Sequence, residues 1–131
     1  MVAAAVAWTG FVWIGRIRNA LADDELRGAA LAGVVALSAT FLVLAASALV
    51  LLVRWARGRA PTRADRAVVL ANLVWAAGVW AVRIVDIAIL DEHDLAFVVV
   101  HVALGVVSVL LWWWALAVVT EGGSEEIAPA G

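Results

Sequence analysis

The sequence contains no cysteine and no lysine, and these absences narrow the chemistry that the chain can carry. Without cysteine there is no disulfide, no thiolate ligand for a metal and no cysteine nucleophile. All nine basic residues are arginine, and charged residues make up only 15% of the 131 positions. His101 is the one histidine that we expect inside an apolar segment, so a haem with two histidine ligands would need a dimer. We expect neither a metal nor another cofactor.

Motifs that mark common enzymes and channels are also missing. There is no glycine-rich phosphate loop, no H-E-x-x-H zinc motif and no G-x-S-x-G nucleophile elbow. The selectivity-filter signature of potassium channels is absent too. The polar segments, roughly 16–28, 54–66, 91–94 and 121–131, are too short to bury a core of their own. We therefore expect no separate catalytic domain and no enzymatic activity.

Apolar residues dominate what is present. They make up 66% of the chain, against about 45–50% in a typical soluble domain. They form four runs, near 2–22, 29–53, 67–90 and 95–119, and a helix needs about 20 residues to cross a ~30 Å hydrocarbon core. The runs are continuous rather than alternating, which excludes a β-barrel. The sequence predicts an all-α, four-helix transmembrane bundle over residues 1–120, followed by a short disordered acidic tail over 121–131.

The first run could instead be a signal peptide, because Ala20-Leu21-Ala22 resembles a cleavage site. A signal peptide, however, carries its positive charges before the apolar stretch. Here Arg16 and Arg18 follow that stretch, and no charged side chain precedes them. We therefore interpret residues 2–22 as a true span.

The two halves of the chain resemble each other when the sequence is shifted by 67 positions. The matching residues Trp8, Val12, Trp13, Arg16 and Ile17 fall on Trp75, Val79, Trp80, Arg83 and Ile84. Each half, near 2–53 and 69–120, is a pair of apolar runs around a short acidic turn. Because each half holds two spans, both halves have the same orientation. This predicts two tandem helical hairpins, a parallel 2+2 repeat, related by an axis along the membrane normal.

Orientation follows from the arginines between the second and third runs. Five of them surround Pro61, opposed only by Asp65: Arg54, Arg57, Arg59, Arg63 and Arg66. Arginine-rich short loops stay in the cytoplasm, so both termini are predicted there and both acidic turns outside. The linker is too short to indicate nucleic-acid binding, and attraction to anionic headgroups explains its charge better. We expect a multi-pass protein of a prokaryotic inner or plasma membrane, or one encoded by a virus.

Polar residues inside the apolar runs mark a candidate site. Arg83 and Asp86 lie on one face of the third apolar run, and His101 lies at a similar depth in the fourth. Arg16 and Asn19 lie at the same level in the first half. Charges within a membrane usually face an interior or a water-filled cavity. This cluster could fasten helices together, form an ion, proton or small-anion pathway, or hold a cofactor or lipid.

Two further residue sets are expected to have structural roles. Small residues at helical spacing predict close helix packing: Gly33, Ala36, Thr40, Gly105 and Ser108. Tryptophans near the cytoplasmic boundary predict an interfacial belt: Trp8, Trp55, Trp75, Trp112, Trp113 and Trp114. Trp13 and Trp80 lie deeper and are expected to pack inside the bundle.

Several functions fit these features. The first is a small non-enzymatic membrane protein, an accessory, structural or assembly subunit of a membrane complex. The second is a minimal transporter or channel that uses the Arg/Asp/His cluster. A third is a holin-like protein of a phage, against which the repeat and the intramembrane charge argue. The bilayer is the expected partner, together with further copies of the chain or other membrane subunits.

Overall fold

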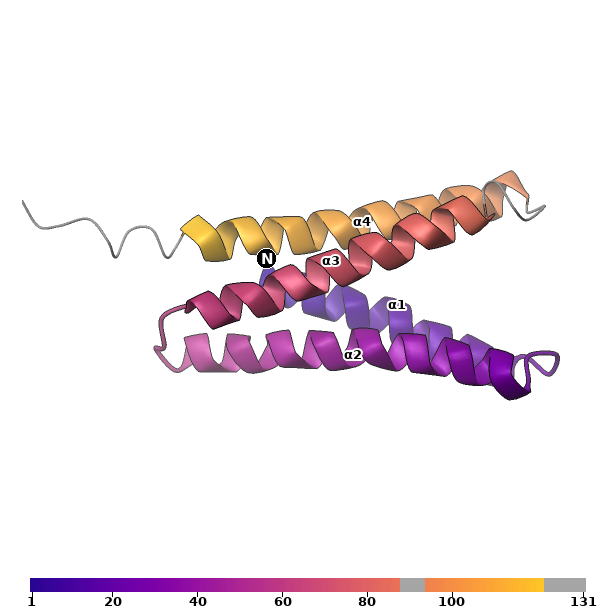
Figure 1. The fold of residues 1–131 in the computed structure, drawn as a ribbon, viewed down its shortest axis with the longest axis horizontal. Coiled ribbons are helices and arrows are strands. Elements are labelled where there is room, and N and C mark those ends of the chain that lie inside the picture. The colour runs from indigo at the N-terminus through magenta and orange to yellow at the C-terminus, as the bar shows by residue number, and fades with distance from the viewer. Residues whose placement is uncertain (88–93, 122–131) are drawn as a thin grey trace, which may run out of the picture.

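The computed structural model describes residues 1–87 and 94–121, and in these ranges it contains helices and no strands (Figure 1). Its elements are α1 (Val2–Ala22), α2 (Gly28–Ala56), α3 (Arg63–Val85) and α4 (Leu95–Glu121). The all-α prediction is confirmed. The expected end of the third apolar run, the turn at Asp91-Glu92-His93 and the tail beyond Glu121 lie outside the described residues.

The helices follow the apolar runs closely, and the differences have local causes. α1 occupies the expected range, whereas α2 continues one turn further, to Ala56. α3 begins at Arg63, four residues earlier than expected. Thr62 and Asp65 form a capping box there, in which each side chain accepts a hydrogen bond from the other residue's backbone N–H. Such a box satisfies two N–H groups that a helix start leaves unpaired, so the helix can begin inside the basic linker.

Three of the described helices, α2, α3 and α4, are long and apolar enough to cross a membrane. α2 has 29 residues, which at 1.5 Å per residue makes it about 43 Å long, more than a ~30 Å hydrocarbon core requires. α1 is not among the three. It has 21 residues, and Arg16, Arg18 and Asn19 lie in its last two turns.

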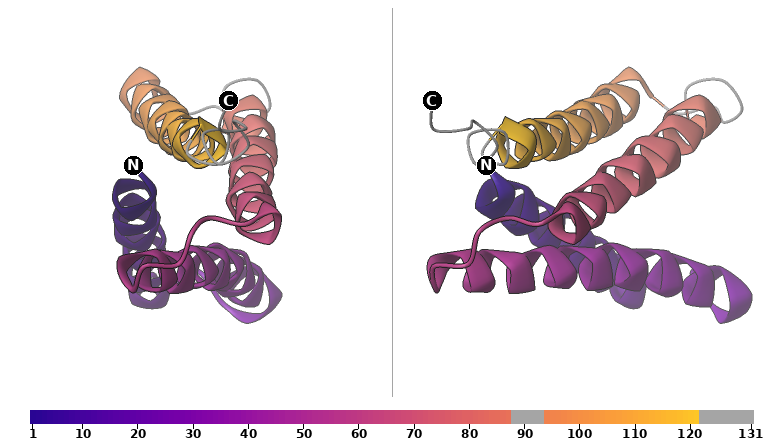
Figure 2. Two further views of the ribbon diagram at one scale, coloured as in Figure 1. Left: turned by 90° about the vertical axis from the view of Figure 1, so that its left-hand side faces the viewer. Right: turned by 60° about the vertical axis from the view of Figure 1, so that its left-hand side comes forward.

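The helices pair as two hairpins, α1 with α2 and α3 with α4 (Figures 1 and 2). The start of α1, the linker from α2 to α3 and the end of α4 lie at one end of the molecule, which we call the linker end. The opposite end, where α1 leads into α2, is the turn end. The two hairpins lie close together at the linker end and diverge toward the turn end (Figure 2).

Hydrogen bonds join the hairpins on the linker side of the bundle. The indole Nε1–H of Trp8 donates to Ser108 Oγ at 2.9 Å, and that of Trp112 donates to Thr9 Oγ1 at 3.2 Å. Asn72 Nδ2 donates to the carbonyl oxygens of Leu44 and Val68. These bonds tie α1 to α4 and α3 to α2.

Aromatic side chains fill the middle of the core. The ring of Trp13 stacks on Phe41 with centroids 3.9 Å apart, and its centroid lies 6.2 Å from that of Trp80. Gly105 makes room for Trp80: a Cβ on Gly105 would lie 3.0 Å from Trp80 Cε3 and 3.1 Å from Ile84 Cδ1. α3 and α4 therefore approach closely where Trp80 lies against Gly105.

Candidate functional site

A cavity of about 440 Å³ lies on the turn side of the Trp13–Trp80 pair, where the hairpins diverge. All four helices contribute to its wall. Its polar lining residues are Arg16, Asn19, Arg83 and His101, and its aromatic ones are Phe11, Trp13, Trp80 and Phe97. The structure thus brings four of the five predicted cluster residues to one cavity, two from each hairpin.

Arg83 and Asp86 form an ion pair, with Nη1 and Oδ2 2.6 Å apart. Their spacing of three residues places them on the same face of α3. Each side chain is more than one third exposed, 37% for Arg83 and 39% for Asp86. The pair therefore lies on the cavity rim and not in the sealed core, and Asp86 is not part of the cavity wall.

Arg16 contributes to the same cavity from α1. No Asp or Glu oxygen lies within ion-pair distance of it in the part of the chain that the structure describes. Arg16 and Arg83 thus bring guanidinium groups from both hairpins to the wall of one cavity. Asn19, one turn further along α1, contributes an amide to the wall.

His101 is held by its own helix. Its Nδ1 lies 2.9 Å from the backbone carbonyl oxygen of Phe97, one turn earlier, and the two rings are 4.0 Å apart. A carbonyl oxygen can only accept, so Nδ1 carries a proton. Within the described ranges no hydrogen bond or ion pair joins His101 to Arg83 or Asp86.

A second, more open groove of about 790 Å³ runs between α2 and α3 on the outside of the bundle. Its lining is almost wholly apolar and includes Thr40, Trp75 and Val82. Arg83 and Asp86 lie at its polar end. Arg83 therefore borders both the inner cavity and this outer groove.

The small residues expected to pack helices occupy two different environments. Gly105 and Ser108 are buried between α4 and its neighbours. Gly33, Ala36 and Thr40 are exposed, and the face of α2 that packs inside the chain is formed by Ser38, Phe41, Ala45, Ala48 and Leu51. The exposed side of α2 thus carries these small residues together with larger apolar ones such as Val43 and Leu49.

The six tryptophans expected at the membrane boundary also differ in their surroundings. Trp112 is 1% exposed and lies inside the bundle, whereas its neighbours Trp113 and Trp114 are 64% and 60% exposed. Trp8 is half-buried and bonded to Ser108, and Trp55 is bonded to Asp65. Trp75 is partly exposed, with its ring centroid 6.1 Å from that of Phe41.

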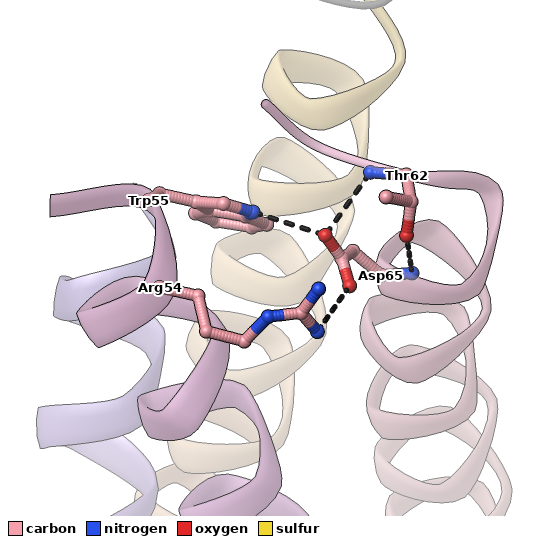
Figure 3. A network of polar contacts seen from close by, with 4 residues as sticks. All are labelled: Arg54, Trp55, Thr62 and Asp65. Carbon is pink, nitrogen blue, oxygen red and sulfur yellow. Dashed lines mark hydrogen bonds and ion pairs between the residues drawn. The ribbon is translucent and has the colours of Figure 1, made fainter. Parts of the chain in front are cut away.

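The linker contains a network that was not predicted as a site, drawn in Figure 3. Asp65 is 1% exposed. One of its oxygens accepts from Arg54 Nη1 at 3.2 Å, and the other accepts from Trp55 Nε1 at 3.1 Å and from the Thr62 backbone N–H at 3.0 Å. The pattern Thr-x-x-Asp after Pro61 was the available signal, because it is typical of a helix start.

No protein-family model, curated protein or solved structure matches this chain. Over residues 1–87 and 94–121, no group of three or more His, Asp or Glu side chains is placed to hold a metal ion.

Proposed function

We propose that the chain is a multi-pass integral membrane protein with one four-helix domain over residues 1–120. The observation that carries this proposal is the apolar outer surface. Bulky apolar side chains are exposed on all four helices, among them Phe11, Val43, Val82, Leu95 and Trp113. Soluble monomers rarely expose contiguous apolar patches larger than a few hundred Å². Hydrocarbon solvates such a surface, and α2, α3 and α4 have the length and composition to span it.

Burial supports the tandem repeat. The buried residues of α1 are Val2, Ala5, Thr9, Trp13 and Ala20. A shift of 67 positions carries them onto Val69, Asn72, Ala76, Trp80 and Ile87, all of which are buried. Four of the five buried residues of α2, Ser38, Phe41, Ala45 and Ala48, likewise fall on Gly105, Ser108, Trp112 and Ala115, which are buried in α4, whereas Leu51 falls on the exposed Val118. A similarity that arose from composition alone would not be expected to select the same buried positions.

Contacts follow the same symmetry. Trp13 and Trp80 are equivalent at this offset, and their rings meet each other. The pair Trp8 and Ser108 corresponds to Trp75 and Phe41, which are also neighbours. These contacts support a twofold relation between parallel hairpins, with its axis passing between Trp13 and Trp80.

Labelling from the two sides of a membrane tests this topology. Because the chain has no cysteine, single cysteines at Asp24 and Gly58 and on an N-terminal extension report without background. We expect Gly58 and the N-terminus to label from the cytoplasmic side and Asp24 from the other. If the N-terminus labels together with Asp24, α1 does not span the membrane and the four-span proposal is wrong.

Within this architecture the proposed role is that of a non-enzymatic accessory, structural or assembly subunit, which works with further copies of itself or with other membrane subunits. The short connections Asp23–Arg27 and Arg57–Thr62 support a role inside the membrane. The exposed small residues of α2, Gly33, Ala36 and Thr40, support helix–helix association with a second chain, because small side chains allow close approach.

Oxidative cross-linking in native membranes tests this association. Ala36→Cys is expected to form a disulfide-linked dimer or a covalent adduct with another subunit. Ala45→Cys is the matched control, since Ala45 lies on the buried face of the same helix. Equal cross-linking of both variants, or of neither, would contradict the assigned interface.

A second candidate function, a minimal transporter or channel, is favoured by one observation. The cavity lined by Arg16, Asn19, Arg83 and His101 lies between the two hairpins, where relative movement of the repeats would open or close it. Uptake of a permanently charged anion into proteoliposomes tests this function. Anion flux that is absent from protein-free liposomes and is abolished by Arg16→Gln would support it, whereas flux equal to that of protein-free liposomes would reject it.

A further inference from the structure

We propose that the cavity between the hairpins binds a monovalent oxyanion attached to an apolar body, with Arg16 as its main charged contact. The proposal deepens the second candidate function and rests on it only for the membrane setting. Binding does not require transport, so the two can be measured apart. The charge, the lining residues and the volume of the cavity each point to such a ligand.

The charge balance of the cavity comes from a difference between the two repeats. Shifted by 67 positions, Arg16 falls on Arg83 and Asn19 falls on Asp86. In the second hairpin the carboxylate of Asp86 neutralises Arg83 at 2.6 Å. In the first hairpin an uncharged amide stands at the equivalent position, so Arg16 keeps its charge. The cavity therefore has one uncompensated positive charge from Arg16, Arg83 and Asp86 together.

An uncompensated arginine at this depth needs an acceptor. Charges inside a membrane are costly and normally pair with another charge or face water. Arg16 shares the cavity wall with Arg83, whose carboxylate partner Asp86 is not part of that wall. An anion beside Arg16 would supply the missing counter-charge, and guanidinium groups bind oxyanions such as carboxylate and phosphate with two parallel hydrogen bonds. The geometry points to one oxyanion group between the hairpins.

The rest of the cavity selects an apolar body. Trp13, Trp80, Phe97 and Leu104 are among its wall residues. Its volume of about 440 Å³ is within the ~300–1,000 Å³ typical of small-molecule sites. A bare inorganic anion would leave most of the aromatic wall uncovered.

Two sources could supply such a ligand: an anionic lipid headgroup with its attached chain, or a soluble organic anion. Both offer an oxyanion on an apolar body. The cavity wall carries both charged and apolar side chains, so it fits either source.

A heavy-atom quencher provides the test. 4-Iodobenzenesulfonate carries one permanent negative charge and quenches indole fluorescence, so its binding in the cavity adds a saturable quenching of Trp13 and Trp80 to any unsaturable quenching of the exposed tryptophans. The full chain is placed in nanodiscs of phosphatidylcholine, and saturable quenching is compared with that of neutral 4-iodobenzenesulfonamide. We expect the sulfonate to bind at least about ten-fold more tightly, as a charge-assisted hydrogen bond allows. Equal quenching by both compounds would overturn the proposal.

Matched variants distinguish binding in the cavity from a general effect of positive charge on the protein. Arg16→Gln is expected to weaken binding about ten-fold or more, whereas Arg18→Gln, two residues away and outside the cavity wall, should leave it unchanged. Asn19→Asp restores the missing carboxylate and should weaken binding as Arg16→Gln does. Asp86→Asn removes the counter-charge of Arg83 and should strengthen binding of the sulfonate. A normal circular dichroism spectrum for each variant excludes unfolding as the cause.

Either of two results would show that the sulfonate does not bind in the cavity. If Asn19→Asp binds as the unchanged protein does, or if Arg16→Gln and Arg18→Gln lose binding equally, the cavity is not the site. Adding phosphatidylglycerol to the nanodiscs distinguishes the sources: competition identifies a lipid headgroup, and unchanged binding identifies a soluble anion. Binding without flux in proteoliposomes would reject the transporter function while supporting the site.

Discussion

Asp65 offers the sharpest test of how the two hairpins are joined. Its carboxylate is 1% exposed and accepts hydrogen bonds from Arg54, Trp55 and the Thr62 backbone. Asp65→Ala removes all three acceptor contacts. It leaves the Trp55 indole N–H and the Thr62 N–H without a partner and leaves Arg54 without a counter-charge. α3 also loses half of its capping box.

The expected cost follows from these losses. A buried donor left unpaired costs about 1–3 kcal/mol, and a lost helix cap costs about 1 kcal/mol. Breaking a fully buried ion pair costs about 3–5 kcal/mol, but the Arg54 side chain is 37% exposed and solvent recovers part of that loss. Together these terms predict that Asp65→Ala lowers the free energy of unfolding by about 2–4 kcal/mol.

Reversible unfolding in mild detergent, followed by circular dichroism, measures this change. Asp65→Asn keeps one carbonyl acceptor but loses the charge, so it should fall between Ala and the unchanged protein. Arg59→Ala is the control, because Arg59 is exposed and in the same linker; it should shift stability by less than about 0.5 kcal/mol. If Asp65→Ala is as stable as Arg59→Ala, the network does not hold α2 to α3.

Two further predictions concern the core, and each has as its control a residue of the same type in a more open environment. Gly105→Leu should lower the free energy of unfolding by about 1–3 kcal/mol through overpacking against Trp80, whereas Gly33→Leu, with open space around its Cα, should cause no loss. Trp112→Phe removes the hydrogen bond to Thr9 and should cost about 1 kcal/mol more than Trp113→Phe, whose ring is exposed. Both comparisons use the same detergent unfolding assay, and equal stabilities within either pair would refute the corresponding packing.

Helix positions could be predicted from the sequence because they depend on local information. Length and continuous apolar composition identify a long helix wherever it packs, and α1 and α4 begin at the expected residues. The early start of α3 was also encoded locally, by Thr62 and Asp65. The ion pair of Arg83 with Asp86 lies within one turn of helix, so spacing alone brought those two residues to one face.

The buried side of each helix was harder to predict, because the sequence of a helix that is apolar all round does not reveal which side packs against its neighbours. Trp112, Trp113 and Trp114 are adjacent and chemically identical, yet only Trp112 is enclosed. Gly33 and Gly105 are both small residues in apolar helices, and only Gly105 has a tryptophan against it. These distinctions arise from contacts between helices, some of which join residues about 100 positions apart in sequence, such as Trp8 with Ser108 and Trp112 with Thr9.

The sequence by itself determined the four helices, the acidic turn Asp23–Glu25 and the equivalence of Arg16 with Arg83, because each depends on composition or spacing along one chain. Only the tertiary structure decided that these two arginines line one cavity and that one of them has no carboxylate partner within the described ranges. It likewise decided that Asp65 is the buried acceptor at the linker. The physical reason is that the surroundings of a charge depend on which helices pack together, and that packing is a property of the whole chain.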